Sequence, residues 1–133
     1  MIKLVASAVS KKGYTRLIPT NLSSTNLLMI YILHCFKKSN SPMYGKEVLD
    51  FINNTTTAWK PSHGTLYPLL SELEGKGYIT NIGTDNKRKF YILTSLGSTI
   101  YEQMLDTYKD TLYSSKSFFD TLVNTLYEKE VII

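Results

Sequence analysis

Hydrophobic residues recur at helical spacing in three successive stretches of the first two thirds of the chain. Residues 27–33 are apolar on nearly every side, which predicts the most buried helix of the domain. Residues 44–52 place apolar and charged side chains on opposite faces, which predicts a second, amphipathic helix. A third helix is expected to begin at Ser62, because Pro61 disfavours helix before it and a serine can cap a first turn. Its leucines recur at i, i+3, i+4 and i+7, and Gly77 suits the left-handed position that follows a helix end.

A β-hairpin is predicted directly after these helices. Residues 78–82 and 89–93 are rich in aromatic and β-branched side chains, and the turn is expected at residues 83–86. Three helices followed by a hairpin is the order of a winged helix-turn-helix domain. The fold class is therefore expected to be mainly α, with a two-stranded wing.

The last stretch predicts one long helix. Residues 98–128 contain neither proline nor glycine, and their apolar residues alternate at spacings of four and three, as in a coiled coil. The seam of this pattern comprises Tyr101, Leu105, Tyr108, Leu112, Ser115, Phe119, Leu122 and Leu126, with one interruption at Ser115. Such a seam predicts self-association, although Met104, Phe118 and Val123 widen it enough to allow packing on the first helix or on the N-terminal extension instead.

These patterns divide the chain into three regions. Residues 1–24 show no sustained period and are treated as an extension, residues 25–97 form the winged-helix domain, and residues 98–133 form the dimerisation helix. The hydrophobic content of 43% is sufficient for a packed core.

Charge is distributed unevenly along the sequence. Residues 1–94 carry 12 Lys and Arg against 5 Asp and Glu, whereas residues 95–133 carry 3 against 6. The formal net charge of +4 therefore belongs to the winged-helix part, and nucleic acid is a reasonable partner for it.

Catalytic and metal chemistry find little support in the sequence. The single cysteine, Cys35, lies in an apolar run, so an intrachain disulfide is impossible and a reducing, cytoplasmic location is expected. His34 and His63 fall in different elements, and no acid–base pair or set of metal ligands accompanies them. No apolar run reaches the ~18 residues of a membrane span. We therefore expect no enzymatic activity, no cofactor, no metal and no membrane association.

The start of the third helix has the properties of a DNA-reading element. A helix that enters the major groove needs a small leading end, which Ser62, His63 and Gly64 provide. Lys87, Arg88 and Lys89 lie at the tip of the hairpin, where a wing can touch the adjacent backbone. Ser62 could be an ordinary helix cap, and the basic residues could simply form a solvated hairpin tip. Two basic features beside one short helix nevertheless favour DNA binding.

These residues also carry a family resemblance. Residues 59–79 (WKPSHGTLYPLLSELEGKGYI) closely resemble the signature of the PadR family of bacterial regulators. Residues 42–48 (PMYGKEV) resemble the start of that family's second helix, and residues 87–97 (KRKFYILTSLG) resemble its wing and exit. The resemblance covers about residues 26–97.

The resemblance implies a homodimeric transcription regulator that binds a palindromic operator, usually as a repressor released by a small-molecule or stress signal. By position, it places the contacts with double-stranded DNA at Tyr44, Lys46, Ser62, His63, Gly64, Thr65, Tyr67, Pro68, Lys87, Arg88 and Lys89. Trp59 is interpreted as a packing anchor. His63 and Lys46 depart from the residues usual in the family, which favours a changed sequence preference with the same binding mode.

Two further possibilities stay open at this point. Some members of the family bind flat aromatic compounds between the dimer helices, although aromatic residues at helical spacing are more often core. Winged helices also serve as protein-binding modules without specific DNA binding, but a basic wing favours DNA.

Overall fold

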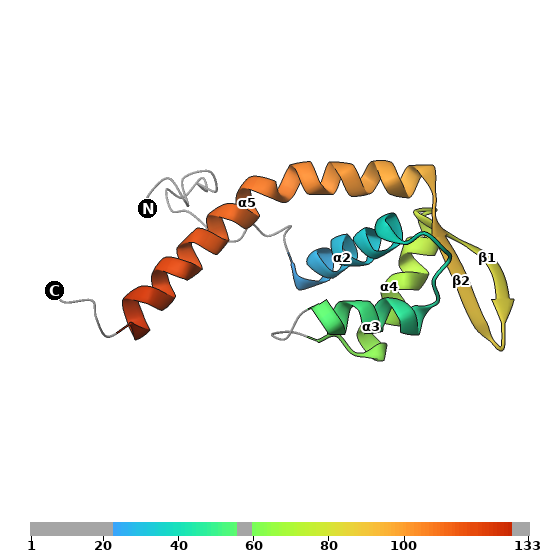
Figure 1. Ribbon diagram of the computed structural model, residues 1–133. Helices are drawn as coiled ribbons and strands as arrows, with labels where there is room; N and C mark the ends of the chain where they lie inside the picture. Colours follow the sequence, from blue (N-terminus) through green and yellow to red (C-terminus); the bar gives the residue numbers. More distant parts are fainter. Residues whose placement is uncertain (1–22, 56–59, 129–133) are drawn as a thin grey trace. The chain divides into compact units, whose positions relative to one another are not determined.

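A computed structural model describes residues 23–55 and 60–128 of the chain. In order, the elements are α2 (Ser24–Lys38), α3 (Gly45–Thr55), α4 (His63–Gly75), β1 (Ile79–Asp85), β2 (Arg88–Leu93) and α5 (Ser95–Tyr127). This order confirms the predicted mainly helical class with a two-stranded antiparallel wing and a long last helix (Figure 1). The predictions for the extension at residues 1–22 and for Trp59 lie outside the described residues.

The chain divides into two compact units, one of which spans Ser24–Leu105. In this unit α2, α3 and α4 each turn one apolar face toward a common core. Its most completely buried side chains are Leu28, Ile32, Leu33, Val48, Ile52, Leu66, Leu73 and Ile79. The hairpin extends beyond the three helices at one end of the unit (Figure 1).

Helix α3 begins at Gly45, close to the predicted start, but it packs differently from the prediction. The backbone N–H of Tyr44 donates to Glu47 Oε1 at 3.1 Å, so a glutamate in the first turn helps to fix the helix start. Phe51, which was expected on the apolar face, is 40% exposed, and Leu49 is buried in its place. The inward stripe is therefore rotated relative to the one inferred from spacing alone.

The end of α4 follows the glycine signal closely. The helix ends at Gly75, and Gly77 adopts a φ of 79°, in the left-handed region that disfavours side chains. The N–H of Tyr78 donates to the carbonyl of Leu73 at 3.0 Å, which closes the end of the helix. The expected left-handed position of Gly77 is confirmed, although the helix stops two residues earlier than Gly77.

The turn of the hairpin was misplaced by the sequence interpretation. Strand β1 continues through Gly83 to Asp85, and the turn residues are Asn86 and Lys87, with φ values of 51° and 65°. The pairing register shifts between Asn81 and Gly83, so a bulge lies within the strand directly before the residues expected to form the turn. Strand β1 is consequently longer than predicted, and the turn reaches the basic tip at Lys87.

The hairpin is joined to α5 by a compact set of hydrogen bonds. The Thr94 hydroxyl donates to the carbonyl of Gly77 at 2.6 Å and accepts from the N–H of Gly97 at 2.9 Å, capping the new helix. Gly97 is buried, and a Cβ there would lie 2.8 Å from the carbonyl carbon of Tyr78. The helix therefore starts at Ser95, three residues before the predicted start, against the backbone that leads into β1.

The first turns of α5 pack on α2. Tyr101 is 4% exposed, and its hydroxyl lies 2.6 Å from His34 Nδ1. Lys37 Nζ donates to Ser98 Oγ at 2.7 Å, and Met104 packs against the core. The alternative of a broad contact with the first helix is thus correct for this part of the predicted seam.

From Leu105 onward α5 carries a row of large apolar side chains with substantial exposure. The seam members among them are Leu105 at 41%, Leu112 at 42%, Phe119 at 46%, Leu122 at 36% and Leu126 at 59%. Ser115, the polar member of the seam, is 8% exposed. Among the described helices, α5 included, none is both long and apolar enough to cross a membrane.

Candidate nucleic-acid interface

The start of α4 is an exposed helix terminus. Ser62 occupies the N-cap position in an extended conformation, with φ −91° and ψ 170°, and its carbonyl accepts from the N–H groups of Thr65 and Leu66 at 3.1 and 3.0 Å. Contrary to the expectation that its side chain would cap the helix, the hydroxyl makes no cap hydrogen bond and lies 3.3 Å from Thr65 Oγ1. The first turn therefore presents backbone donors and hydroxyls suited to phosphate or base edges.

The two faces of α4 are sharply different. The inner face buries Leu66, Leu69, Leu70 and Leu73 at 0–8% exposure. On the outer face, His63 and Tyr67 stack with ring centroids 5.5 Å apart and planes 9° apart. Pro68 lies inside the helix and has no N–H, so the carbonyl of exposed Gly64 lacks the donor that an ordinary residue four positions later would supply. The outer face thus combines two stacked polar rings with a backbone carbonyl that lacks its usual i+4 donor.

Tyr67 is held by a close approach between two helices. Gly45, the first residue of α3, is buried, and a Cβ there would lie 2.9 Å from Tyr67 Cζ. Tyr67 remains 43% exposed although its ring closes on this glycine. Glycine is therefore needed at this position for the Tyr67 ring to lie across the start of α3.

The wing carries an arginine that is fixed by aromatic rings. The guanidinium carbon of Arg88 lies 4.7 Å from the ring centroid of Tyr44 and 5.9 Å from that of Phe90, and these two rings meet edge to face at 5.2 Å. An Asp85 carboxylate oxygen forms an ion pair with Arg88 Nη2 across the turn, at 3.5 Å. Cation–π contacts of this kind contribute about 0.5–1 kcal/mol each at exposed sites. Arg88 is held in place, whereas Lys87 and Lys89 are exposed.

A groove of about 300 Å³ brings the wing and the helices together. Its lining residues are Tyr44, Gly45, Tyr67, Leu70, Ser71, Lys87, Arg88, Lys89 and Tyr91. Five of the residues predicted from sequence therefore share one concave surface, and the lining contains three cations and no carboxylate. A surface of this charge is suited to a polyanion.

The remaining predicted contacts lie outside this lining. Ser62, His63, Gly64, Thr65 and Pro68 are all exposed residues of α4 or its cap. Lys46 also lies outside the groove, and its Nζ pairs with Asp50 at 3.3 Å on the exposed face of α3. The sequence interpretation missed Gly45 and Phe90 as residues that hold Tyr67 and Arg88, and the only signal for them was their presence within the matched motifs.

Chemistry of other kinds has little basis in the described part of the chain. Burial raises the pKa of the Cys35 thiol from 9.0 to about 12, so a thiolate is absent at neutral pH. His34 is engaged with Tyr101 rather than with the neighbouring cysteine. Within residues 23–55 and 60–128, no group of three or more His, Cys, Asp or Glu side chains could hold a metal ion.

Comparisons with known proteins agree with this geometry. The model of the transcriptional regulator PadR-like family matches residues 32–103, more than half of the chain. Comparison with curated protein sequences gives no match.

Similar solved structures come from several organisms. A putative transcriptional regulator from Thermoplasma acidophilum has 24% identity and a TM-score of 0.59, covering 77% of this chain and 93% of its own. A PadR family transcription regulator from Clostridium difficile has 21% identity and a TM-score of 0.54, covering 74% and 95%. A PadR-like transcriptional regulator from Bacillus cereus has 25% identity and a TM-score of 0.52, covering 79% and 95%.

Proposed function

The chain belongs to the PadR-like family of transcriptional regulators, and we propose that it binds a palindromic operator as a homodimer and represses the adjacent gene. The observation that carries this proposal is the groove in which the wing cations meet the exposed face of α4. α4 is short and its leading end is exposed, as a helix that enters the major groove should be. Repression rests on the family resemblance, as does release by a small-molecule or stress signal.

The proposed division of labour follows from the chemistry of each contact. Lys87, Arg88 and Lys89 offer cations to phosphates, which fix position and carry no sequence information. His63 and Tyr67 offer ring nitrogen and hydroxyl groups that can bond to base edges in the major groove. Because Arg88 is held by two aromatic rings, it loses less side-chain freedom on binding than Lys87 or Lys89.

A second copy of the chain is the proposed partner of α5. Leu105, Leu112 and Phe119 recur every seven residues and are 41–46% exposed, so burial against an identical helix would remove apolar surface from water. Two copies related by a twofold axis present two α4 helices, which matches two half-sites of a palindrome. Tyr101 is excluded from this interface because it is 4% exposed in the core of its own unit.

The test begins with selection of DNA fragments from the host genome on the immobilised full chain. We expect enrichment of fragments with a common inverted repeat that overlaps promoter sequences. Arg88→Ala should weaken binding to all fragments about equally, whereas His63→Ala and Tyr67→Ala should change which bases are preferred.

The matched control for Arg88→Ala is Lys109→Ala. It removes one exposed cation from α5 that is not among the residues proposed to contact DNA. Recovery of fragments without a common sequence would contradict the proposal of an operator. Equal weakening by Lys109→Ala and Arg88→Ala would contradict the placement of the interface. If His63→Ala and Arg88→Ala had the same effect on which bases are preferred, the proposed roles of base contact for His63 and phosphate contact for Arg88 would be contradicted.

A further inference from the structure

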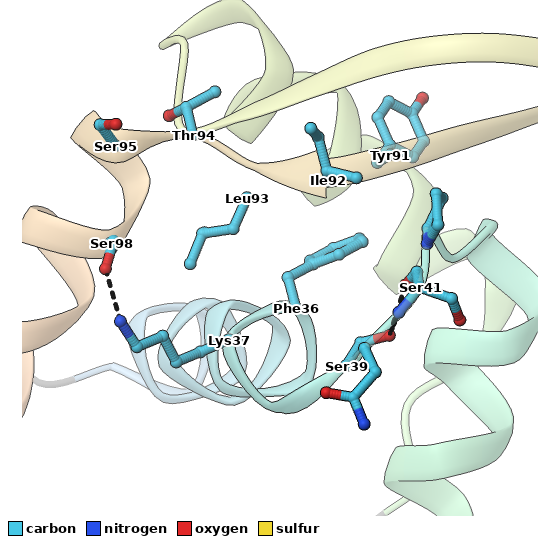
Figure 2. A pocket seen from close by; sticks show the side chains of 12 residues that line it. Phe36, Lys37, Ser39, Ser41, Tyr91, Ile92, Leu93, Thr94, Ser95 and Ser98 are labelled. Carbon is cyan, nitrogen blue, oxygen red and sulfur yellow. Dashed lines mark hydrogen bonds between the residues drawn. The ribbon is translucent and has the colours of Figure 1, made fainter.

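A second hollow lies in the Ser24–Leu105 unit, between the end of α2, strand β2 and the start of α5 (Figure 2). Its volume is about 410 Å³, and of its lining residues only Tyr91 also lines the groove described above. The lining residues are Phe36, Lys37, Ser39, Asn40, Ser41, Pro42, Tyr91, Ile92, Leu93, Thr94, Ser95 and Ser98. The hollow is therefore a site apart from the one assigned to DNA.

The floor of this hollow is apolar. Phe36 is 5% exposed, and the side chain of Leu93 extends from β2 toward it (Figure 2). Ile92 stands beside them on β2 and is 39% exposed. A branched aliphatic group placed above Phe36 would cover the partly exposed side chains of Ile92 and Leu93.

The wall on the α5 side carries the charge. Lys37 is the one ionised residue of the lining, and its Nζ donates to Ser98 Oγ at 2.7 Å. The same nitrogen also forms an ion pair, at 4.0 Å, with Glu102 Oε1, which lies outside the lining. An ammonium group has three donors, so Lys37 can donate to a ligand carboxylate while it keeps its bond to Ser98.

Strand β2 adds an open backbone edge to the same hollow. Tyr91 exchanges backbone hydrogen bonds with Met43, at 3.1 and 2.9 Å, as an isolated bridge that no further described residue continues. Because backbone groups alternate along a strand, the N–H and C=O of Leu93 point to the same side as those of Tyr91. The N–H of Thr94 bonds to Tyr78 on the β1 side at 3.0 Å, as this alternation requires.

We propose that this hollow binds a small organic anion that carries an amide and a branched apolar group, as an N-acyl amino acid does. The carboxylate lies at Lys37, the amide pairs with the open edge at Leu93, and the apolar group rests on Phe36. The absence of a carboxylate among the lining residues favours an anion over a cation of the same shape. The proposal concerns binding alone and holds whether or not the protein binds DNA.

The test is a titration of the ¹⁵N-labelled full chain, followed by amide chemical shifts. The probe is N-acetyl-L-leucine, and its neutral analogue N-acetyl-L-leucinamide differs only in the carboxylate. We expect saturable shifts of the backbone amides of Lys37, Leu93 and Ser98 with the acid, and about fivefold weaker binding of the amide analogue. N-acetylglycine, which lacks the apolar group, should also bind more weakly.

Two lysine variants sharpen this result. Lys37→Met should reduce binding of the acid to the level of the amide analogue, whereas Lys38→Met, one residue along α2 and outside the lining, should leave it unchanged. The same spectra report whether each variant is folded. Absence of saturable shifts at these amides up to the solubility of the acid would overturn the proposal, as would equal binding of acid and amide by the unmodified chain.

Discussion

The two ends of α5 follow one sequence pattern but have different surroundings. Near its start, Tyr101 is 4% exposed and bonded to His34 of α2. Further along, Leu112 and Leu126 belong to the same seam and are 42% and 59% exposed. A heptad pattern therefore identifies an apolar helix face that needs a packing partner, but it does not identify that partner.

The largest effect should come from removing the buried end of this seam. Tyr101→Ala is expected to lower the free energy of unfolding by about 3–5 kcal/mol, because it leaves a cavity under α2 and removes the partner of His34. Urea denaturation followed by circular dichroism measures the change. Tyr113→Ala, which truncates a 67% exposed tyrosine of the same helix, serves as the control and should cost less than about 0.5 kcal/mol. Equal losses in the two variants would show that the ends of α5 do not differ in this way.

A smaller loss is expected where α5 begins. Gly97→Ala forces a methyl group against the carbonyl of Tyr78, which is backbone and cannot move aside cheaply, so about 1–3 kcal/mol should be lost. Gly75→Ala is the matched control, since no atom lies within 4 Å of its added Cβ. Thermal unfolding of both variants checks the prediction. A Gly97 variant as stable as the Gly75 variant would contradict the close packing of this joint.

A substitution at the exposed end of the seam should change the oligomeric state of the protein rather than its free energy of unfolding. Leu112→Asp is expected to give a monomer in sedimentation velocity while its helical content is retained, because a charge on the proposed dimer face must lose its hydration on association. Thr121→Asp adds the same charge at an exposed position outside the seam and should remain dimeric. An unchanged mass for Leu112→Asp would mean that this face does not join two copies.

The smallest expected effect on stability concerns Cys35, which is buried on α2, the helix on which the first turns of α5 pack. Burial raises its thiol pKa to about 12, so at pH 8 the native protein holds almost no thiolate, whereas an unfolded chain has an ordinary cysteine. Because the thiol pKa is higher in the folded protein than in the unfolded chain, the folded state is favoured by this group at pH values below the unfolded pKa. That contribution to the free energy of unfolding is lost as the pH rises from 9.0 toward 12. Labelling by a disulfide reagent should therefore be slow in buffer and fast in denaturant. Equal rates would contradict the burial.

How far the sequence predicted the fold depended on whether a local signal was sufficient. The leucine spacing of α4 and the left-handed Gly77 are local features, and both were predicted correctly. The turn was assigned around Gly83 because glycine favours turns, yet β1 runs through it with a bulge, and Lys87 takes a left-handed conformation that is rare for lysine. A bulge depends on pairing across the hairpin, which one strand's sequence does not contain.

The candidate site was predicted in its parts but not in its arrangement. Tyr44, Tyr67 and Arg88 were proposed from sequence, and they line one groove. The fit of Tyr67 on Gly45 was not predictable, because it depends on how closely two helices approach. The same holds for Phe51 and Leu49, whose exchange of places follows from a small rotation of α3 that spacing cannot resolve.

The groove between α4 and the wing is proposed to bind DNA through its cations. The most direct test is the affinity of the full chain for a selected operator fragment at several salt concentrations, measured by fluorescence anisotropy. The logarithm of the affinity should fall linearly with the logarithm of salt concentration, by about 0.9 per phosphate contacted, and Arg88→Ala should make this slope shallower by about one such contact. An affinity that is the same at low and high salt would contradict the claim.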